Sequence, residues 1–123
     1  MSFASIRIIT EDVDRLVAFY ERVTGQAAVR PAPVFAQLVS PGATLAIASP
    51  VTVAVLGDAV TPAANRSVVV EFEVADVDAE FARLEPEPAD VVLPPTTMAW
   101  GNRSALFRDP DGNLVNLFSR PTA

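Results

Sequence analysis

The residues of this sequence that could do chemistry are carboxylates, arginines and one amide, because the chain has neither histidine nor cysteine. It therefore lacks the commonest general base, the commonest metal ligand and any thiolate nucleophile. Glu71 and Glu73 lie two residues apart, so on a strand their side chains would point to the same face. Such a pair could bind a hard cation weakly or act as acid and base, which makes both residues weak catalytic candidates.

Asn116 is a further candidate, in the stretch "FRDPDGNLVNLF". It lies four residues after Gly112, at a place where a carboxylate would be able to ligate a metal or act as a base. The turn at 109–112 is explained by local chemistry, since proline presets φ, glycine supplies a positive φ and aspartate bonds the backbone. The ligand spacing of a calcium loop is absent.

Composition bounds the class of protein. The 123 residues are 50% hydrophobic with a mean hydropathy of +0.33, as in one packed globular domain. The net charge of −6 and the pI of about 4.4 argue against nucleic acid and an anionic membrane as partners. The apolar run Val51–Leu56 is too short to span a bilayer, and residues 1–5 have no signal-peptide pattern. We expect a cytoplasmic location.

An internal repeat organises the chain. Alternating residues 5–10 predict a strand, Asp12 predicts a helix cap, and the helical spacing that follows ends at Gly25. Sixty-four residues later the same pattern returns, with alternation over 67–74, Asp76 as the cap and a helix to Leu84. Further strands are predicted at Phe35–Val39, Thr44–Ser49, Ser104–Arg108 and Leu114–Ser119, with weaker ones near Ala27–Arg30 and Asp90–Leu93, where prolines crowd in. Each half is predicted to be β-α-β-β-β, with module 1 at about 1–56, a linker at 57–65 and module 2 at about 66–121.

The alternation also assigns faces to the first strand of each module. We expect burial against the helices for Ile6, Ile8, Val68, Val70, Phe72 and Val74. The opposite face would then hold Ser5, Arg7, Val69, Glu71 and Glu73. Because Arg7 and Glu71 occupy equivalent places in the repeat, an Arg7–Glu71 ion pair is favoured over independent ligand roles for the two residues. Burying such a pair is costly, so we expect it where water or a polar ligand reaches it.

Two motifs carry a family resemblance. "DVDRLVAFYERVTG" after the first strand and "WGNRSALFRDPDGNLVNLF" near the end resemble the vicinal oxygen chelate superfamily of glyoxalase I, fosfomycin-resistance proteins, extradiol dioxygenases and bleomycin-resistance proteins. The resemblance covers essentially the whole chain. It implies an α+β fold in which two paired βαβββ modules form cup-shaped curved sheets with the helices on the outer side. It also implies a homodimer.

Family enzymes hold a divalent metal with side chains on the first and last strand of each module. The matching positions in this sequence are Ser5 and Val69 on the first strands, and Ala46 and Asn116 on the last. Hydroxyl, methyl, isopropyl and amide groups do not hold Zn²⁺, Fe²⁺ or Mn²⁺ at useful affinity. We therefore expect no family-type metal and no cofactor.

The concave side is the predicted ligand site. Its proposed residues are Ser5, Arg7, Phe35, Val69, Glu71, Trp100, Arg103, Asn116 and Phe118. Trp100 would either close the site over a ligand or pack at the end of the barrel. Arg103 would contact an anionic ligand or, by the favoured structural interpretation, pair with Asp109 or Asp111.

Three functions remain open. The leading one is a metal-free protein of the bleomycin-resistance type that binds a small organic molecule, possible ligands being an antibiotic or a metabolite. The second is a divergent family enzyme (lyase, isomerase or dioxygenase-like) that uses Glu71 or Glu73 as a base or a non-standard metal site. The third is a ligand-free interaction dimer whose cup is filled by side chains such as Phe35, Ile9 and Phe118.

Overall fold

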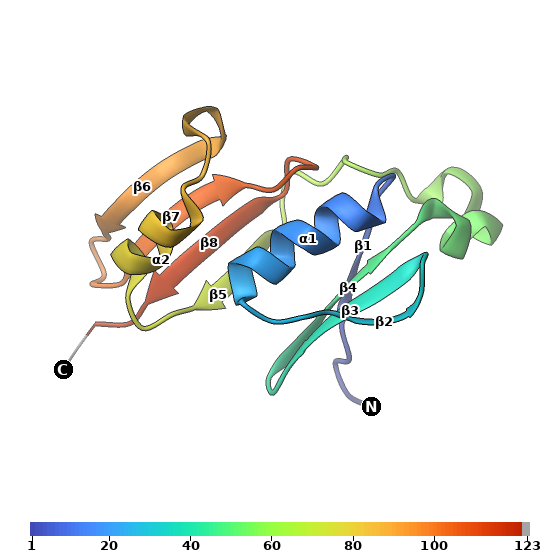
Figure 1. The fold of residues 1–123 in the computed structure, drawn as a ribbon, viewed down its shortest axis with the longest axis horizontal. Coiled ribbons are helices and arrows are strands. Elements are labelled where there is room, and N and C mark those ends of the chain that lie inside the picture. Colours follow the sequence, from blue (N-terminus) through green and yellow to red (C-terminus); the bar gives the residue numbers. More distant parts are fainter. Residues whose placement is uncertain (122–123) are drawn as a thin grey trace. The chain divides into compact units, whose positions relative to one another are not determined.

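The computed structural model describes residues 1–121. The chain divides between Ala64 and Asn65 into two compact modules, and each contains a four-stranded mixed sheet and an α-helix (Figure 1). This is the predicted α+β fold of two βαβββ modules.

Module 1 forms a sheet with the strand order β1-β4-β3-β2. Its elements are β1 (Ile6–Ile9), α1 (Val13–Thr24), β2 (Val29–Ala32), β3 (Phe35–Ser40), β4 (Ala43–Ala48) and the 3₁₀ segment η1 (Pro50–Ala59). β1 runs parallel to β4, whereas the β3 pairings with β2 and β4 are antiparallel. Two parallel neighbours cannot be joined by a tight turn, and here α1, β2 and β3 lie between β1 and β4 along the chain.

Module 2 repeats this arrangement with the strand order β5-β8-β7-β6. Its elements are β5 (Val69–Glu73), α2 (Val77–Leu84), the short 3₁₀ turn η2 (Pro88–Asp90), β6 (Val91–Thr97), β7 (Arg103–Arg108) and β8 (Leu114–Ser119). β5 is parallel to β8, and the two hairpin pairings are antiparallel. Pro94 and Pro95 fall in the outermost strand, β6, where the pairing with β7 shifts register. Proline is tolerated at such an edge because its missing N–H is not needed there.

Both helices begin at the predicted caps. The Asp12 carboxylate accepts a hydrogen bond from the Arg15 backbone N–H, and Asp76 accepts one from that of Ala79, each at 3.0 Å. Each aspartate thus satisfies one of the four unpaired N–H groups of a first helical turn. α1 ends at Gly25 with φ +69°, as predicted from the glycine.

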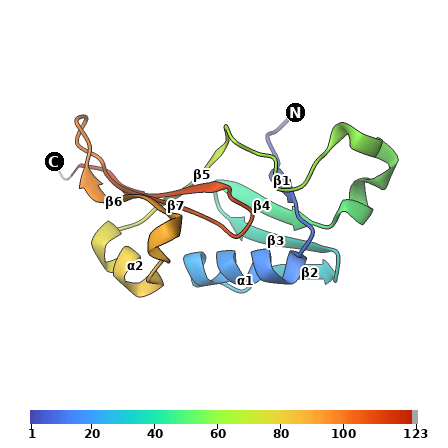
Figure 2. The ribbon, with the colours of Figure 1, turned by 90° about the horizontal axis from the view of Figure 1, so that it is seen from above.

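Each helix covers one face of its own sheet (Figure 2). The face under α1 buries Ala36 and Ile47, and the face under α2 buries Ala105, Val115 and Leu117. A close-packed layer of this kind is the main source of stability in a small module.

The predicted burial of the first strands is correct only in part. Ile8, Val70, Phe72 and Val74 are partly buried, but Ile6 and Val68 are 46% and 44% exposed. α1 packs mainly on β3 and β4, and α2 on β6, β7 and β8, so the edge strands β1 and β5 begin beyond the main helix contacts.

The η1 segment was not predicted. It consists of two short 3₁₀ turns with breaks at Val53 and Gly57, over residues expected to form the end of module 1 and the start of a linker. Val53 is its buried residue, in a cluster with Ile9 and Ala48. No helix within residues 1–121 is both long and apolar enough to cross a membrane.

Candidate functional site

The face of each sheet opposite its helix is called the open face below, and in module 2 it carries Glu71 and Asn116. β5 and β8 run parallel with Glu71 beside Asn116, and β7 places Leu106 on the other side of Asn116. The Asn116 Nδ2 donates a hydrogen bond of 2.9 Å to Glu71 Oε2. Two predicted site residues that are far apart in the sequence are therefore in direct contact.

Of the two polar atoms of the Asn116 side chain, only Nδ2 has a hydrogen-bond partner within the described chain. The residue is 9% exposed, and its Oδ1 is buried without a hydrogen-bond partner among residues 1–121. A buried acceptor that has lost water and gained no donor costs about 1–3 kcal/mol, and such groups are rare in folded proteins. Because this oxygen is itself covered, a bound molecule can donate to it only when the Asn116 amide or a neighbouring side chain moves.

Partly exposed apolar side chains surround this pair. By register, the neighbours on the same face are Val69, Leu106, Leu114 and Phe118. Val69 and Phe118 were predicted for the site, whereas Leu106 and Leu114 were missed because only strand register shows that they flank Asn116. The result is a polar pair within an apolar surface, the usual composition of a ligand site.

Glu73 differs from Glu71 although it lies on the same strand and face. Its carboxylate accepts a hydrogen bond of 2.9 Å from Arg120 Nε in an exposed ion pair. The Arg120 guanidinium also lies 5.7 Å from the centre of the Phe118 ring. Of the two catalytic candidates, Glu73 is thus paired with a cation and Glu71 is paired with a neutral amide.

Module 1 has a different open face. Arg7 pairs with Ala46, and Ala46 with Gln37, so the place of Asn116 is taken by a methyl group. Ser5 is exposed and precedes β1. The expected Arg7–Glu71 ion pair would join the two modules and stays a prediction.

The end of this face is filled by side chains of the module itself. Phe35 packs against the buried cluster of Ile9, Ala48 and Val53, so its aromatic ring has partners without any ligand. Part of the predicted ligand surface of module 1 therefore serves packing.

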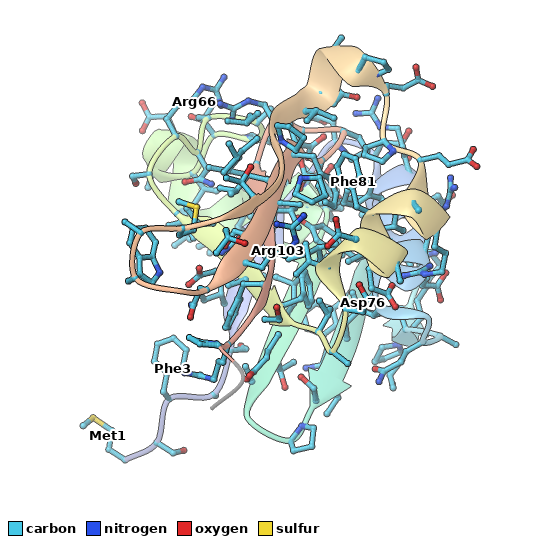
Figure 3. The ribbon with its side chains drawn as sticks, turned by 90° about the vertical axis from the view of Figure 1, so that its left-hand side faces the viewer. Met1, Phe3, Arg66, Asp76, Phe81 and Arg103 are labelled. Carbon is cyan, nitrogen blue, oxygen red and sulfur yellow. The ribbon has the colours of Figure 1, made fainter. Side chains whose placement is uncertain are left out.

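Arg103 lies on the helix side of its sheet and is not brought together with Asn116. It shares a face with Ala105 and Phe107, and Figure 3 shows it beside α2, the helix that carries the labelled Phe81. Its Nε and Nη2 donate to Asp78 of α2 at 2.6 and 2.7 Å. The predicted pairing of Arg103 with Asp109 or Asp111 was therefore wrong, because Arg103, Ala105 and Phe107 all face the α2 side of the sheet. Hydrogen bonding to Arg103 lowers the pKa of Asp78, and the same contact raises the pKa of Arg103.

Trp100 is 68% exposed. It sits in the turn between β6 and β7, which is closed by hydrogen bonds from Met98 N to Asn102 O at 2.7 Å and from Gly101 N to Met98 O at 2.9 Å. Gly101 has φ +99°, a conformation that favours glycine. Such exposure does not support packing within the described chain, and contact with a ligand stays a prediction.

The turn before β8 is held by a buried polar network. Asp109 Oδ1 accepts from the backbone N–H groups of Asp111 and Asn113, and Asp109 Oδ2 accepts from Asn113 Nδ2 at 2.8 Å. Asn65 Nδ2 donates to Asn113 Oδ1 at 3.1 Å. These contacts confirm the turn chemistry predicted for 109–112, and they fix the start of the strand that carries Asn116.

The residues at the family metal positions do not fit a divalent metal. Ala46 and Val69 have no donor atom, and the Asn116 amide is engaged by Glu71. Within the described part of the chain, no group of three or more histidine, cysteine, aspartate or glutamate side chains is placed to hold a metal ion. A single carboxylate and an amide do not make a site for Zn²⁺ or Fe²⁺.

Comparisons with known proteins agree with this fold. The family model described as "Glyoxalase/Bleomycin resistance protein/Dioxygenase superfamily" matches residues 2–117. A protein of unknown function from Agrobacterium tumefaciens str. C58 is 27% identical, with a TM-score of 0.80 over 97% of this chain and 94% of that chain. A glyoxalase-related enzyme from Fulvimarina pelagi is 22% identical, with a TM-score of 0.81 over 98% of this chain and 88% of that one, and shows the fold alone. A search of curated proteins gave no match.

Proposed function

The chain belongs to the Glyoxalase/Bleomycin resistance protein/Dioxygenase superfamily, and we propose that it binds a small organic molecule on the open face of module 2 without a metal ion. The observation that carries this proposal is the buried, unsatisfied Oδ1 of Asn116 beside Glu71. A chain selected for stability alone would gain from an apolar residue at this position.

The chemistry of the site residues favours binding over metal-dependent catalysis. The family metal positions offer no ligand set, and Glu73 is paired with Arg120. What the open face does offer is apolar area around a few polar atoms, which can orient a molecule and exclude water from it. We therefore propose that the protein binds and sequesters its ligand without reacting with it, as bleomycin-resistance proteins do.

We also propose that two copies associate. Ile6, Val29 and Val39 are 46%, 56% and 55% exposed, although all three lie on strands. Apolar side chains on sheet edges and faces are commonly covered by a partner. Light scattering after size exclusion should give twice the 13.1 kDa chain mass, and a monomer at micromolar concentration would contradict this part of the proposal.

The function is tested with protein purified without chelators. Elemental analysis should find divalent metal far below one equivalent, and EDTA should leave the melting temperature unchanged. A panel of apolar, polar and cationic antibiotics and metabolites should then contain compounds that raise the melting temperature in the presence of EDTA. One equivalent of metal that EDTA removes with a loss of stability would overturn the proposal, and so would a panel in which no compound stabilises the protein.

A further inference from the structure

We infer that Glu71 and Asn116 form an acceptor site for an organic cation with two or more N–H donors, such as an amidinium or guanidinium, attached to an apolar body. This inference rests on the proposed function and specifies the class of ligand that the open face of module 2 takes. The contacts that support it, between Glu71, Asn116 and their strand neighbours, lie within module 2.

The polar atoms that Glu71 and Asn116 leave for a ligand are hydrogen-bond acceptors. Asn116 uses its amide N–H₂ toward Glu71 Oε2, and this orientation leaves its Oδ1 as the unsatisfied atom. Glu71 is a carboxylate, whose oxygens only accept. The pair therefore offers acceptors only, an exposed one on Glu71 and a covered one on Asn116 that a ligand reaches by displacing its neighbours, and a ligand with donors is needed to satisfy both.

Glu71 carries a charge that no arginine within residues 65–121 pairs with. All nine basic residues of the chain are arginines, and those of module 2 have other partners. These contacts are Arg66 with the Asn65 carbonyl, Arg83 with Glu80, Arg103 with Asp78, Arg108 with the Gly112 carbonyl and Arg120 with Glu73. Within the described part of module 2, Glu71 thus has no cationic partner, and the inference takes its charge to bind a ligand cation in place of Arg7, the partner predicted from the sequence.

Apolar side chains surround the two acceptors. Val69, Leu106, Leu114 and Phe118 provide apolar contact around the two acceptors. A hydrated Ca²⁺ or Mg²⁺ would need several more oxygen ligands than one carboxylate and one amide provide. An anionic group would be repelled by Glu71, and a neutral group with one donor would satisfy only one of the two acceptors. A weakly hydrated, flat organic cation meets all three conditions.

Benzamidine and benzoate form a matched pair of probes, because they have nearly the same shape and opposite charge. Each is titrated into ¹⁵N-labelled full-length protein with EDTA present, and amide shifts are followed. Benzamidine should give saturable shifts at the Asn116 side-chain N–H₂ and along residues 69–73 and 114–118, and benzoate should give none there.

Two variants test the assignment of the charge. Glu71→Gln keeps the shape and should weaken benzamidine binding about tenfold, the loss expected for one charged hydrogen bond. Glu73→Gln lies on the same strand and face, and it should change the affinity less than about twofold because Glu73 already pairs with Arg120. Unchanged spectra outside β5 and β8 would show that both variants are folded.

The outcomes separate this inference from the proposed function. Equal binding by the Glu71→Gln variant, or benzoate shifts at Asn116, would overturn the inference. If benzamidine fails but a neutral compound of the panel shifts the same open-face residues, the inference is wrong and the proposed function stands. If no compound shifts these residues, both are wrong.

Discussion

The two modules share a fold and differ in what their open faces carry. On the helix side, Ile8 beside Ile47 in module 1 corresponds to Phe72 beside Leu117 in module 2. One residue earlier on each strand, on the open side, Arg7 beside Ala46 corresponds to Glu71 beside Asn116. The repeat thus preserves apolar pairs where the helix packs and changes the chemistry where it does not.

The difference assigns separate tasks to the two modules. The open face of module 1 is partly filled by Phe35 and Val53, so its side chains stabilise the module. The open face of module 2 keeps Asn116 buried and half satisfied, at a cost to stability. A feature that weakens one copy of a repeat and is absent from the other is best explained by function.

The largest effects should come from the helix-facing pair that the modules share. Ile47 and Leu117 are 0% and 1% exposed and occupy equivalent strand positions. Ile47→Ala and Leu117→Ala should each lower the free energy of unfolding by about 2–5 kcal/mol, measured by urea denaturation. A loss in only one module would show that the two cores are not equivalent, and Glu73→Gln serves as the surface control.

The next effect separates two buried asparagines of module 2. The Asn113 amide is hydrogen-bonded to both Asp109 and Asn65. Asn113→Leu should therefore lower the free energy of unfolding by about 2–3 kcal/mol, because both partners lose their hydrogen bond. Asn116→Leu removes an unsatisfied carbonyl and should be neutral or stabilising by up to about 1 kcal/mol, with loss of ligand binding. Similar destabilisation by both variants would mean that Asn116 serves the fold.

The helix caps should behave alike in the two modules. Asp12→Ala and Asp76→Ala each remove one carboxylate bond to a first-turn N–H. Each should lower the free energy of unfolding by about 1 kcal/mol in thermal or urea melts. Asp12→Asn and Asp76→Asn are matched controls that keep a capping oxygen and should lose less.

The smallest effect is the pH dependence of the Asp78–Arg103 pair. The pKa of Asp78 is lowered in the folded state, so the pair stabilises above the unfolded pKa and this contribution is lost as pH falls through the folded pKa. Asp78→Asn should therefore be slightly less stable than wild type at neutral pH, and the difference should vanish in acid. The pair is solvent-exposed, which keeps the effect small. A difference that persists or grows in acid would contradict this assignment.

The sequence predicted the repeat, the caps and the strands well because each has a local signal. Asp12, Asp76 and Gly25 act through their own backbone neighbours, and the strands show alternation. The η1 segment was missed because its apolar residues have no helical or strand period, and their packing on Ile9 depends on tertiary contact.

The site was predictable only where position in the repeat was enough. The placement of Glu71 was predicted from alternation and that of Asn116 from the family resemblance, but their hydrogen bond depends on the register of β5 and β8. Arg103 was placed at the ligand site without an argument from alternation, whereas it shares a face of β7 with Ala105 and Phe107, and its partner, Asp78, lies 25 residues away. Long-range polar pairs of this kind have no signal in a single sequence.

The central claim is that the open face of module 2 binds an organic molecule without a metal. It is tested most directly by mapping a compound of the panel that stabilises the protein on ¹⁵N spectra, recorded with EDTA and again with one equivalent of Zn²⁺. We predict shifts at the Asn116 side chain and along β5 and β8 that are the same in both conditions. Shifts that require Zn²⁺, or that fall on the helix-covered face around Arg103, would contradict the account.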